Sequence, residues 1–458
     1  MFSSQIIKKY NYYTIALTIF IFSLILRLHN NGVSSLSLDE MISLHISKNS
    51  FLDSFYYNHP PLYFQLLKCW MNLVPPSEGS FRLLNAIISA CSTLALGWLG
   101  LKIYNPKASI VMMLLHSVFP VSIVNAQQIS NYSLFELISI IQFYYFLTYT
   151  KFQQNKTKLI VTTVMNLMTN YFAALLILLQ LAFTQREKIK IEKLFLYLML
   201  SLIAVSLIVD VIDVQSLAWQ KAEFLFNKDG FLPTALLKSF LYLSPLSGAL
   251  IIALSFKFFK DHYNQHKASL ILGFVAIFLL MLVSLLMQRF IFAPRYFTFL
   301  IPGFIIFIWH IIANLGQREK YGQYYLVLTL SIIIVAAVSE YNKYVPIKIS
   351  NWYYASQKIG KFNEGLIVTS LPEYIRYPYF AEIQPGITTF RKYEDLVSQI
   401  NMYQGKNIWL MDTYLSFLSY QEKLNRDLAL LNYKVIDFSI QEPNVDPIML
   451  FKIEKKMQ

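Results

Sequence analysis

An acidic pair follows the first apolar run of the chain. Asp39 and Glu40 come a short loop after the run from Tyr12 to Leu26. A carboxylate at a membrane boundary costs desolvation energy unless it is solvated or serves a function. A positioned carboxylate can remove a proton from a hydroxyl as a general base. Asp39 is therefore a candidate catalytic base, with Glu40 as its neighbour. The alternative is that Asp39 caps the N-terminus of an amphipathic helix.

Basic side chains lie at the edges of three other apolar runs. His59 precedes two prolines, Arg82 opens a run, and Arg295 and Tyr296 follow Pro294. An arginine can hold a phosphate through two parallel hydrogen bonds, and a histidine can contact a phosphate or a metal. The alternatives are a helix-capping role for His59 and snorkelling membrane anchors for the two arginines.

The composition indicates several transmembrane helices that position these residues. Of the 458 residues, 56% are hydrophobic and 14% are charged, whereas soluble proteins carry about 25% charged residues. The net charge is +13, but the Lys and Arg residues gather between apolar runs, as the positive-inside rule predicts. No pattern typical of nucleic-acid binding is present. Cys69 and Cys91 form no CxxC motif, which argues against redox chemistry.

The basic loops also set the orientation of the spans. Lys8 and Lys9 place the N-terminus in the cytoplasm, so that Asp39, His59 and the start of the run at Arg82 lie outside. Further spans are predicted near residues 81–101, 108–124, 132–150, 194–214, 233–256, 268–287, 296–315 and 324–340.

The stretch 159–184 needs a different explanation. Basic loops flank it on both sides, but it is too short for two full spans of about 20 residues each. We therefore expect two short or re-entrant helices that meet at Asn170–Tyr171. The total is about eleven crossings, which leaves the C-terminus outside.

The composition changes from about residue 341. Strand-like runs at 366–371, 407–412, 433–438 and 448–453 alternate with helical patterns at 393–403 and 416–431. This alternation predicts a small α/β domain. The fold class expected is an all-α polytopic membrane domain over residues 1–340, followed by an extracytoplasmic α/β domain over 341–458, in a multi-pass protein of the cell (inner) membrane.

Five motifs occur in an order that resembles a known family. They are LDE at 38–40, HPPLYF at 59–64, FRLLNAI at 81–87, PVSIVNAQQISNYSL at 120–134 and PRYFTFLIPGF at 294–304. Together they resemble the lipid-phosphate-sugar-dependent glycosyltransferases with the C-type (GT-C) fold, in the superfamily of protein O-mannosyltransferases and aminoarabinose transferases. The resemblance covers roughly residues 12–345.

The resemblance implies an activity and a role for several residues. Asp39 would be the catalytic base, and Arg295 and Tyr296 would lie beside the carrier phosphate. His59 would lie near the donor phosphate or a divalent metal, with Arg82 as a further phosphate contact. The donor would be a sugar on a polyprenyl phosphate, and a glycan, lipid or protein hydroxyl would attack it with inversion.

Two segments depart from the family pattern. The family reads close to Q-E-A-R-x-Y where this chain has QQISNY at 127–132, so Gln128 replaces the acid while Tyr132 stays. The family often carries T-H-Y-F where this chain has TNYF at 169–172. Gln128, Tyr132, Asn170 and Tyr171 are candidates for the acceptor side. The histidine missing at position 170 weakens the case for a metal, and no metal site is predicted, although a divalent cation stays open.

Other protein classes fit the sequence less well. A transporter would place ionisable residues deep in its spans, whereas most acids here lie in loops; Glu136, Asp210 and Asp213 lie at or inside span ends. A polymerase or ligase of lipid-linked glycans would be expected to carry a large outer loop, and 215–232 is short. A non-catalytic scaffold with the same fold is the remaining alternative.

Overall fold

The computed structural model divides the chain into two compact units. One comprises Met1–Asn31 and Ile46–Val345, and the other comprises Gly32–His45 and Pro346–Gln458. The structure describes residues 2–32, 36–51, 60–152, 154–174, 176–177, 180, 298–306, 308–309, 366–369, 387–389, 393–402, 407–413, 423–430, 433–437 and 448–455. The spans predicted between 194 and 287 and at 324–340 lie outside these residues, as do His59, Arg295 and Tyr296.

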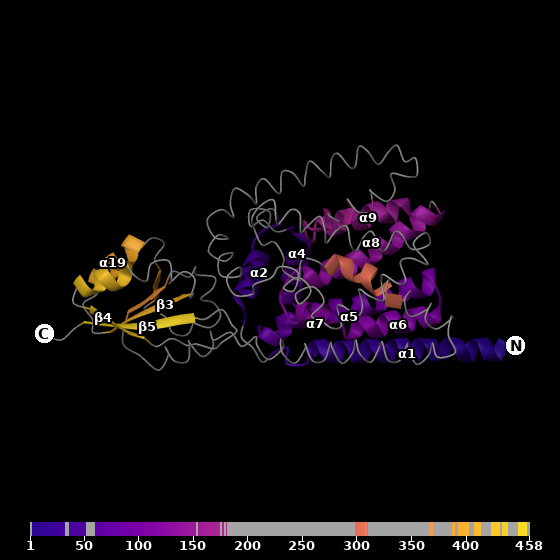
Figure 1. Ribbon diagram of the computed structural model, residues 1–458, viewed down its shortest axis with the longest axis horizontal. Coiled ribbons are helices and arrows are strands. Elements are labelled where there is room, and N and C mark those ends of the chain that lie inside the picture. The colour runs from indigo at the N-terminus through magenta and orange to yellow at the C-terminus, as the bar shows by residue number, and fades with distance from the viewer. Residues whose placement is uncertain are drawn as a thin grey trace, which may run out of the picture. The chain divides into compact units, whose positions relative to one another are not determined.

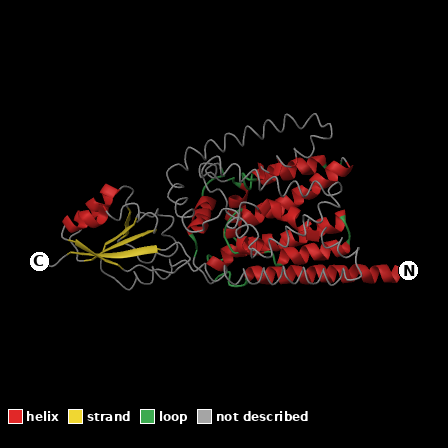
Figure 2. Ribbon diagram, viewed as in Figure 1, coloured by secondary structure: helices red, strands yellow, loops and turns green. Residues whose placement is uncertain are grey.

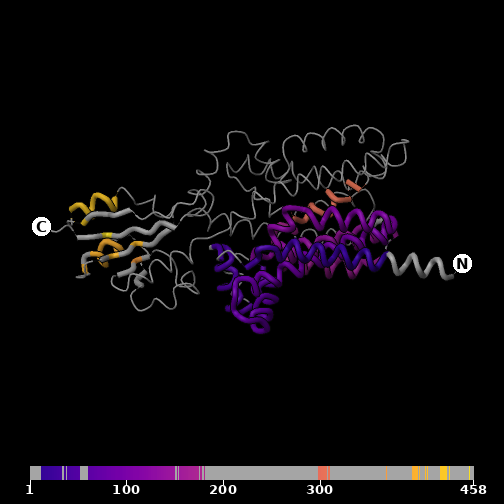
Figure 3. Tube along the Cα trace, turned by 90° about the horizontal axis from the view of Figure 1, so that it is seen from below, coloured from indigo at the N-terminus to yellow at the C-terminus, as the bar shows by residue number. Residues whose placement is uncertain are grey.

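The first unit is built from helices that pack side by side (Figures 1 and 2). Its labelled helices are α1 (Phe2–Leu28), α4 (Leu62–Met71), α5 (Glu78–Ile103), α6 (Pro106–Ser117), α7 (Pro120–Ala126), α8 (Tyr132–Phe152) and α9 (Lys156–Leu167). Figure 3 shows α1 running along the same neighbours from a second direction. Helices α5 and α8 cover the spans predicted at 81–101 and 132–150.

Helix α5 has the length and apolar composition of a membrane span. Ser77 caps it, since the Ser77 hydroxyl accepts the Ser80 N–H at 3.1 Å. The exposed faces of α1, which packs on α5, and of α9, which packs on α8, are also rich in apolar side chains, which suits contact with lipid. The exposed residues are Ile15, Leu17, Ile21, Phe22 and Ile25 on α1, and Ile160, Val161, Val164 and Met165 on α9.

Two glycines let α5 and α6 approach closely. Ser109 of α6 donates a hydrogen bond to the Gly97 carbonyl at 2.6 Å. A Cβ atom at Gly97 would lie 2.5 Å from Cγ of Met113, and one at Gly100 would lie 3.0 Å from Cα of Ser109. Small residues at such positions are how membrane helices pack their backbones together.

The span predicted at 108–124 is bent rather than continuous. Helix α6 ends at Ser117, α7 begins at Pro120, and the two axes differ by 59°. Proline has no N–H and clashes with the carbonyl four residues earlier, and it pushes the preceding residue out of the helical region. Phe119 is accordingly extended, with φ −70° and ψ 116°. One continuous span was predicted because the apolar run continues through this break.

A turn follows α9 where the short hairpin was predicted. Residues 168–172 form turns, and the chain is helical again at 173–174 and 176–177. The amide oxygen of Asn170 accepts the Phe172 N–H at 2.9 Å, which is an Asx-type turn. The two helical segments therefore meet at Asn170–Tyr171, as expected.

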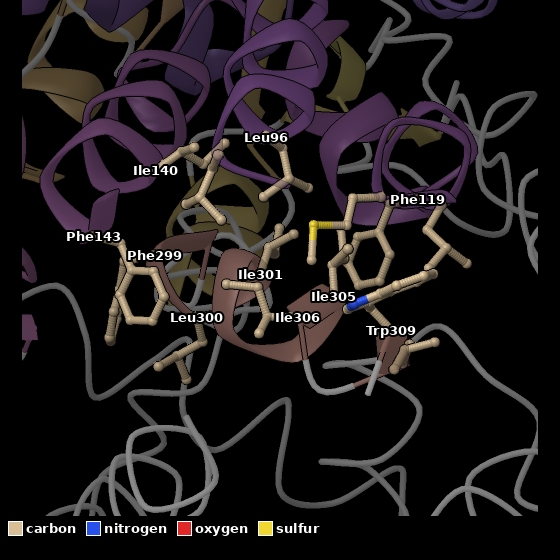
Figure 4. Close-up of a cluster of buried hydrophobic side chains, with 14 of the residues drawn as sticks. Leu96, Phe119, Ile140, Phe143, Phe299, Leu300, Ile301, Ile305, Ile306 and Trp309 are labelled. Carbon is tan, nitrogen blue, oxygen red and sulfur yellow. The ribbon is translucent and has the colours of Figure 1, made fainter. Parts of the chain in front are cut away.

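A late segment of the chain packs into the core of this bundle. Figure 4 shows Phe299, Leu300 and Ile301 near side chains of α5 and α8, and they belong to one buried cluster with Val121 of α7. The rings of Phe135 and Phe299 lie 5.7 Å apart. Phe135 belongs to the first turn of α8. The end of the PRYFTFLIPGF motif therefore packs near the N-terminus of α8.

The second unit contains a five-stranded mixed sheet in the order β2-β1-β3-β5-β4. Its strands are β1 (Leu366–Thr369), β2 (Ile387–Thr389), β3 (Asn407–Thr413), β4 (Tyr433–Asp437) and β5 (Ile448–Lys455), and α19 (Tyr393–Met402) precedes β3. Strand β1 is parallel to β2 and β3, and β5 is antiparallel to β3 and β4. Four strands coincide with the predicted runs. Strand β2 was not predicted, because three residues carry no alternating pattern.

Candidate functional site

Four of the segments singled out in the sequence meet at one end of the helix bundle. The Leu62 N–H at the start of α4 donates to the Met168 carbonyl at 2.9 Å. The Asn131 amide, in the turn between α7 and α8, donates to the Thr169 carbonyl at 2.7 Å. The HPPLYF segment, the QQISNY turn and the TNYF hairpin are thus in direct contact. The FRLLNAI segment joins them through a single residue.

That residue is Asn85, which is fully buried on α5. Its amide oxygen accepts the Tyr63 hydroxyl at 2.9 Å. Its amide nitrogen donates to the carbonyl of Ser130 at 2.7 Å and also to that of Gln128. Asn85 therefore fixes the backbone of the Gln127–Asn131 turn. Tyr63 and Asn85 lie in the HPPLYF and FRLLNAI motifs, but the sequence alone indicated no role for either residue.

Arg82 is buried inside the protein, not extended toward a membrane surface. One guanidinium nitrogen donates to the Asn31 carbonyl at 2.9 Å, just after α1 ends. The preceding residue, Asn30, has a positive φ of 58°. The Gln127 amide donates to the His29 carbonyl at 2.8 Å. Arg82 and Gln127 together hold the end of α1 against this site, so the anchor interpretation of Arg82 does not describe its position.

The acceptor-side candidates surround the same turn. Gln128, Tyr132 and Tyr171 are half-buried, and Asn170 is buried. The Asn170 side chain closes the hairpin turn, so it has a structural role at this position. The other three present part of their side chains at the surface of the bundle end.

The acidic pair lies at the start of α2 (Leu38–Lys48). The Glu40 carboxylate accepts the Ser37 N–H at 2.8 Å, and the Ser37 hydroxyl lies 3.4 Å from the Glu40 N–H. This reciprocal pair is a capping box. Ser37, not Asp39, is therefore the cap, and that alternative for Asp39 is wrong. Glu40 is buried, whereas the Asp39 side chain is exposed.

Metal ligands do not cluster in the described part of the chain. No group of three or more His, Cys, Asp or Glu side chains is close enough there to hold an ion.

Comparison with known proteins gives the fold. No protein-family model and no curated protein matches the sequence. The crystal structure of apo ArnT from Cupriavidus metallidurans is similar, with a TM-score of 0.55, 11% identity and 98% of each chain covered. The crystal structure of ArnT from the same organism bound to undecaprenyl phosphate is similar too, with a TM-score of 0.50 and 11% identity. The match covers 96% of this chain and 97% of ArnT.

A second transferase has the same architecture. The oligosaccharyltransferase AglB from Archaeoglobus fulgidus, in complex with an inhibitory peptide and a dolichol-phosphate, gives a TM-score of 0.55 at 11% identity, covering 98% of this chain and 75% of AglB. The fold is thus that of the GT-C membrane glycosyltransferases over nearly the whole chain. With the apolar helix α5, it indicates a membrane protein.

Proposed function

We propose that this chain, a membrane protein with the GT-C glycosyltransferase fold, transfers a sugar from a polyprenyl phosphate to an acceptor hydroxyl on the outer face of the membrane. The observation that carries the proposal is the meeting of the HPPLYF, FRLLNAI, QQISNY and TNYF segments through direct hydrogen bonds at one bundle end. The likeness to ArnT and AglB, which were solved with lipid phosphates, supports it.

Asp39 is the proposed base. An acceptor hydroxyl is a poor nucleophile, so a carboxylate must take its proton as the bond to the anomeric carbon forms. The capping box engages the Glu40 carboxylate, whereas the Asp39 carboxylate is exposed. Asp39 is therefore the better placed of the two to meet a hydroxyl. Glu40 supports it by fixing the first turn of α2.

The leaving polyprenyl phosphate gains negative charge as the glycosidic bond breaks. Arg295, Tyr296 and His59 are proposed to stabilise that charge through hydrogen bonds, which are charge-assisted for Arg295. Arg82 donates to the Asn31 carbonyl and so holds the chain where α1 ends. Gln128, Tyr132 and Tyr171 are proposed to contact the acceptor. The reaction inverts the anomeric configuration, because the acceptor attacks opposite the phosphate.

The test is donor turnover by the purified protein in lipid vesicles. A panel of radiolabelled undecaprenyl-phosphate sugars is supplied with a membrane extract as the source of acceptors, and donor consumption is followed by thin-layer chromatography. We expect one donor to be consumed, and Asp39→Asn to slow its consumption by about 10²–10⁴-fold, the range for one proton-transfer group. Binding of the donor lipid should not change. Equal rates for the parent and Asp39→Asn would remove the assignment of the base.

A non-catalytic scaffold is the second candidate. The observation that favours it is the QQISNY turn, which lacks the acid and the arginine of the family pattern. Binding of undecaprenyl phosphate without turnover of any donor in the panel would favour the scaffold over the enzyme.

A further inference from the structure

The bend between α6 and α7 leaves backbone carbonyls without the usual helical partners. Pro120 cannot donate to the His116 carbonyl, which accepts the Phe119 N–H at 3.1 Å instead, and the extended Phe119 ends the regular helix at Ser117. Arg27 of α1 occupies this break. Its guanidinium donates to the Ser117 carbonyl at 3.1 Å and to the His116 carbonyl at 3.3 Å. Irregular backbone at membrane depth needs such partners.

A continuous chain of hydrogen bonds leads from Arg27 across the bundle. Arg27 donates to the Ser23 hydroxyl at 2.6 Å, and this hydroxyl lies 2.8 Å from that of Thr93. The Thr93 hydroxyl lies 2.8 Å from Nδ1 of His116, and Nε2 of His116 lies 2.8 Å from the Glu136 carboxylate. A carboxylate only accepts and a guanidinium only donates. With a neutral imidazole at His116 that donates from Nε2 to Glu136, every bond in the chain runs from Arg27 toward Glu136.

The chain ends on α7. The Ser122 hydroxyl donates to the same Glu136 oxygen at 2.6 Å, and the Ser122 carbonyl accepts the Ser89 hydroxyl at 3.3 Å. Ser89 in turn accepts a hydrogen bond from Arg27 at 2.7 Å. Helix α7 is thus held on both sides by one network, and four residues after Ser122 it ends and the Gln127–Asn131 turn begins.

We infer that Arg27, His116, Glu136 and Ser122 form a positioning network that fixes the direction of α7 and, through it, the Gln127–Asn131 turn. Its consequence for sugar transfer rests on the proposed function. Burying a charged pair costs desolvation energy that an apolar contact would not, so a contact between helices alone would not call for it. One Glu136 oxygen has no hydrogen-bond partner among the described residues, which adds to that cost. The network instead fixes the geometry of the backbone at the bend between α6 and α7.

A second buried polar cluster supplies the control. Asn166 of α9 donates to Ser139 at 3.1 Å and to Gln142 at 2.7 Å, both on α8. Ser139 is as fully buried as Ser122. The hydrogen bonds of Ser139 do not reach the α6–α7 bend. Ser139→Ala is therefore a matched control for Ser122→Ala.

The experiment measures the turn directly. Gln128→Cys is placed in a Cys69→Ser, Cys91→Ala background, and its labelling by an impermeant maleimide is timed in vesicles. Removing the Ser122 hydroxyl costs α7 its charge-assisted hydrogen bond to Glu136 and loosens the turn that follows, so we expect Ser122→Ala to speed labelling about fivefold or more. Ser139→Ala should leave the rate unchanged, and both variants should melt within a few degrees of each other.

Activity is the second readout. If the network positions the acceptor turn, Ser122→Ala lowers kcat while donor binding stays constant. Equal labelling rates in the Ser122→Ala and Ser139→Ala proteins, or a rise in both, would overturn the inference. Faster labelling confined to Ser122→Ala, together with no donor consumption by the parent protein that keeps Gln128, would contradict the proposed function and leave the positioning network in place.

Discussion

The two neighbouring carboxylates at the start of α2 have different surroundings. Glu40 is buried in a reciprocal cap with Ser37, and Asp39 is exposed. The pattern Ser-x-x-Glu indicates a capping box, so the sequence alone could have predicted that Ser37 and Glu40 form the cap and that Asp39 does not. We expect Ser37→Ala to lower the free energy of unfolding by about 0.5–2 kcal/mol, the usual worth of a cap. Denaturant unfolding measures it, and donor turnover should change far less than in Asp39→Asn.

Asn85 shows what a sequence does not reveal about a single residue. An asparagine inside an apolar run has no recognisable partner until distant segments meet. Asn85→Leu leaves the Tyr63 hydroxyl and two carbonyls without their hydrogen bond, and it should cost about 2–4 kcal/mol of stability. Tyr63→Phe alone should cost about 1 kcal/mol, and almost nothing in the Asn85→Leu background. Additive losses in this double-mutant cycle would contradict the coupling.

Arg295 is the proposed contact of the carrier phosphate. Arg295→Ala should weaken binding of undecaprenyl phosphate by about 1.5–3 kcal/mol, the worth of a hydrogen bond to a charged group. Arg295→Lys should recover only part of that loss, because an ammonium group cannot form the two parallel hydrogen bonds of a planar guanidinium. Thermal shift of the protein with added lipid phosphate measures both. If both variants bind like the parent, Arg295 is a membrane anchor.

At the scale of elements, the length of the apolar runs predicted the described helices well, but it did not predict where a helix is interrupted. The spans around α5 and α8 follow directly from composition. The bend at Pro120 was overlooked because the apolar run continues through it, even though the proline itself marks the break. The Arg27 network was missed for another reason. Its members lie on α1, α5, α6, α7 and α8, and no local pattern joins them.

The α5–α6 contact yields a prediction for that pair of helices. Gly100 faces the Ser109 backbone, which cannot move aside, whereas Gly97 faces the flexible Met113 side chain. Gly100→Ala should therefore destabilise the protein by about 1–3 kcal/mol, the usual cost of overpacking. Gly97→Ala should cost less. Thermal melting in detergent compares the two, and an equal loss would show that Met113 is as confined as the backbone.

At the scale of the whole molecule, the charge pattern predicts which bundle end faces outward. Leu73, between α4 and α5, and Phe152, at the end of α8, are both exposed on loops predicted to lie on opposite sides. In a background without the two native cysteines, Leu73→Cys should react with an impermeant maleimide in intact cells. Phe152→Cys should react only after permeabilisation. The reverse pattern would invert the topology and move the proposed site to the cytoplasmic face.

The hydrogen bonds of Asn85 have a consequence for how this fold can diverge. Its amide holds the turn through the carbonyls of Gln128 and Ser130, and not through their side chains. Every amino acid brings the same backbone carbonyl, so a change of side chain at these two positions keeps both acceptors of the Asn85 amide. Among the positions where this chain departs from the family pattern, Gln128 and Ser130 are held in this way, whereas Asn170 closes its turn with its own side chain. The side chains at Gln128 and Ser130 can therefore change while the backbone of the turn keeps its hydrogen bonds to Asn85.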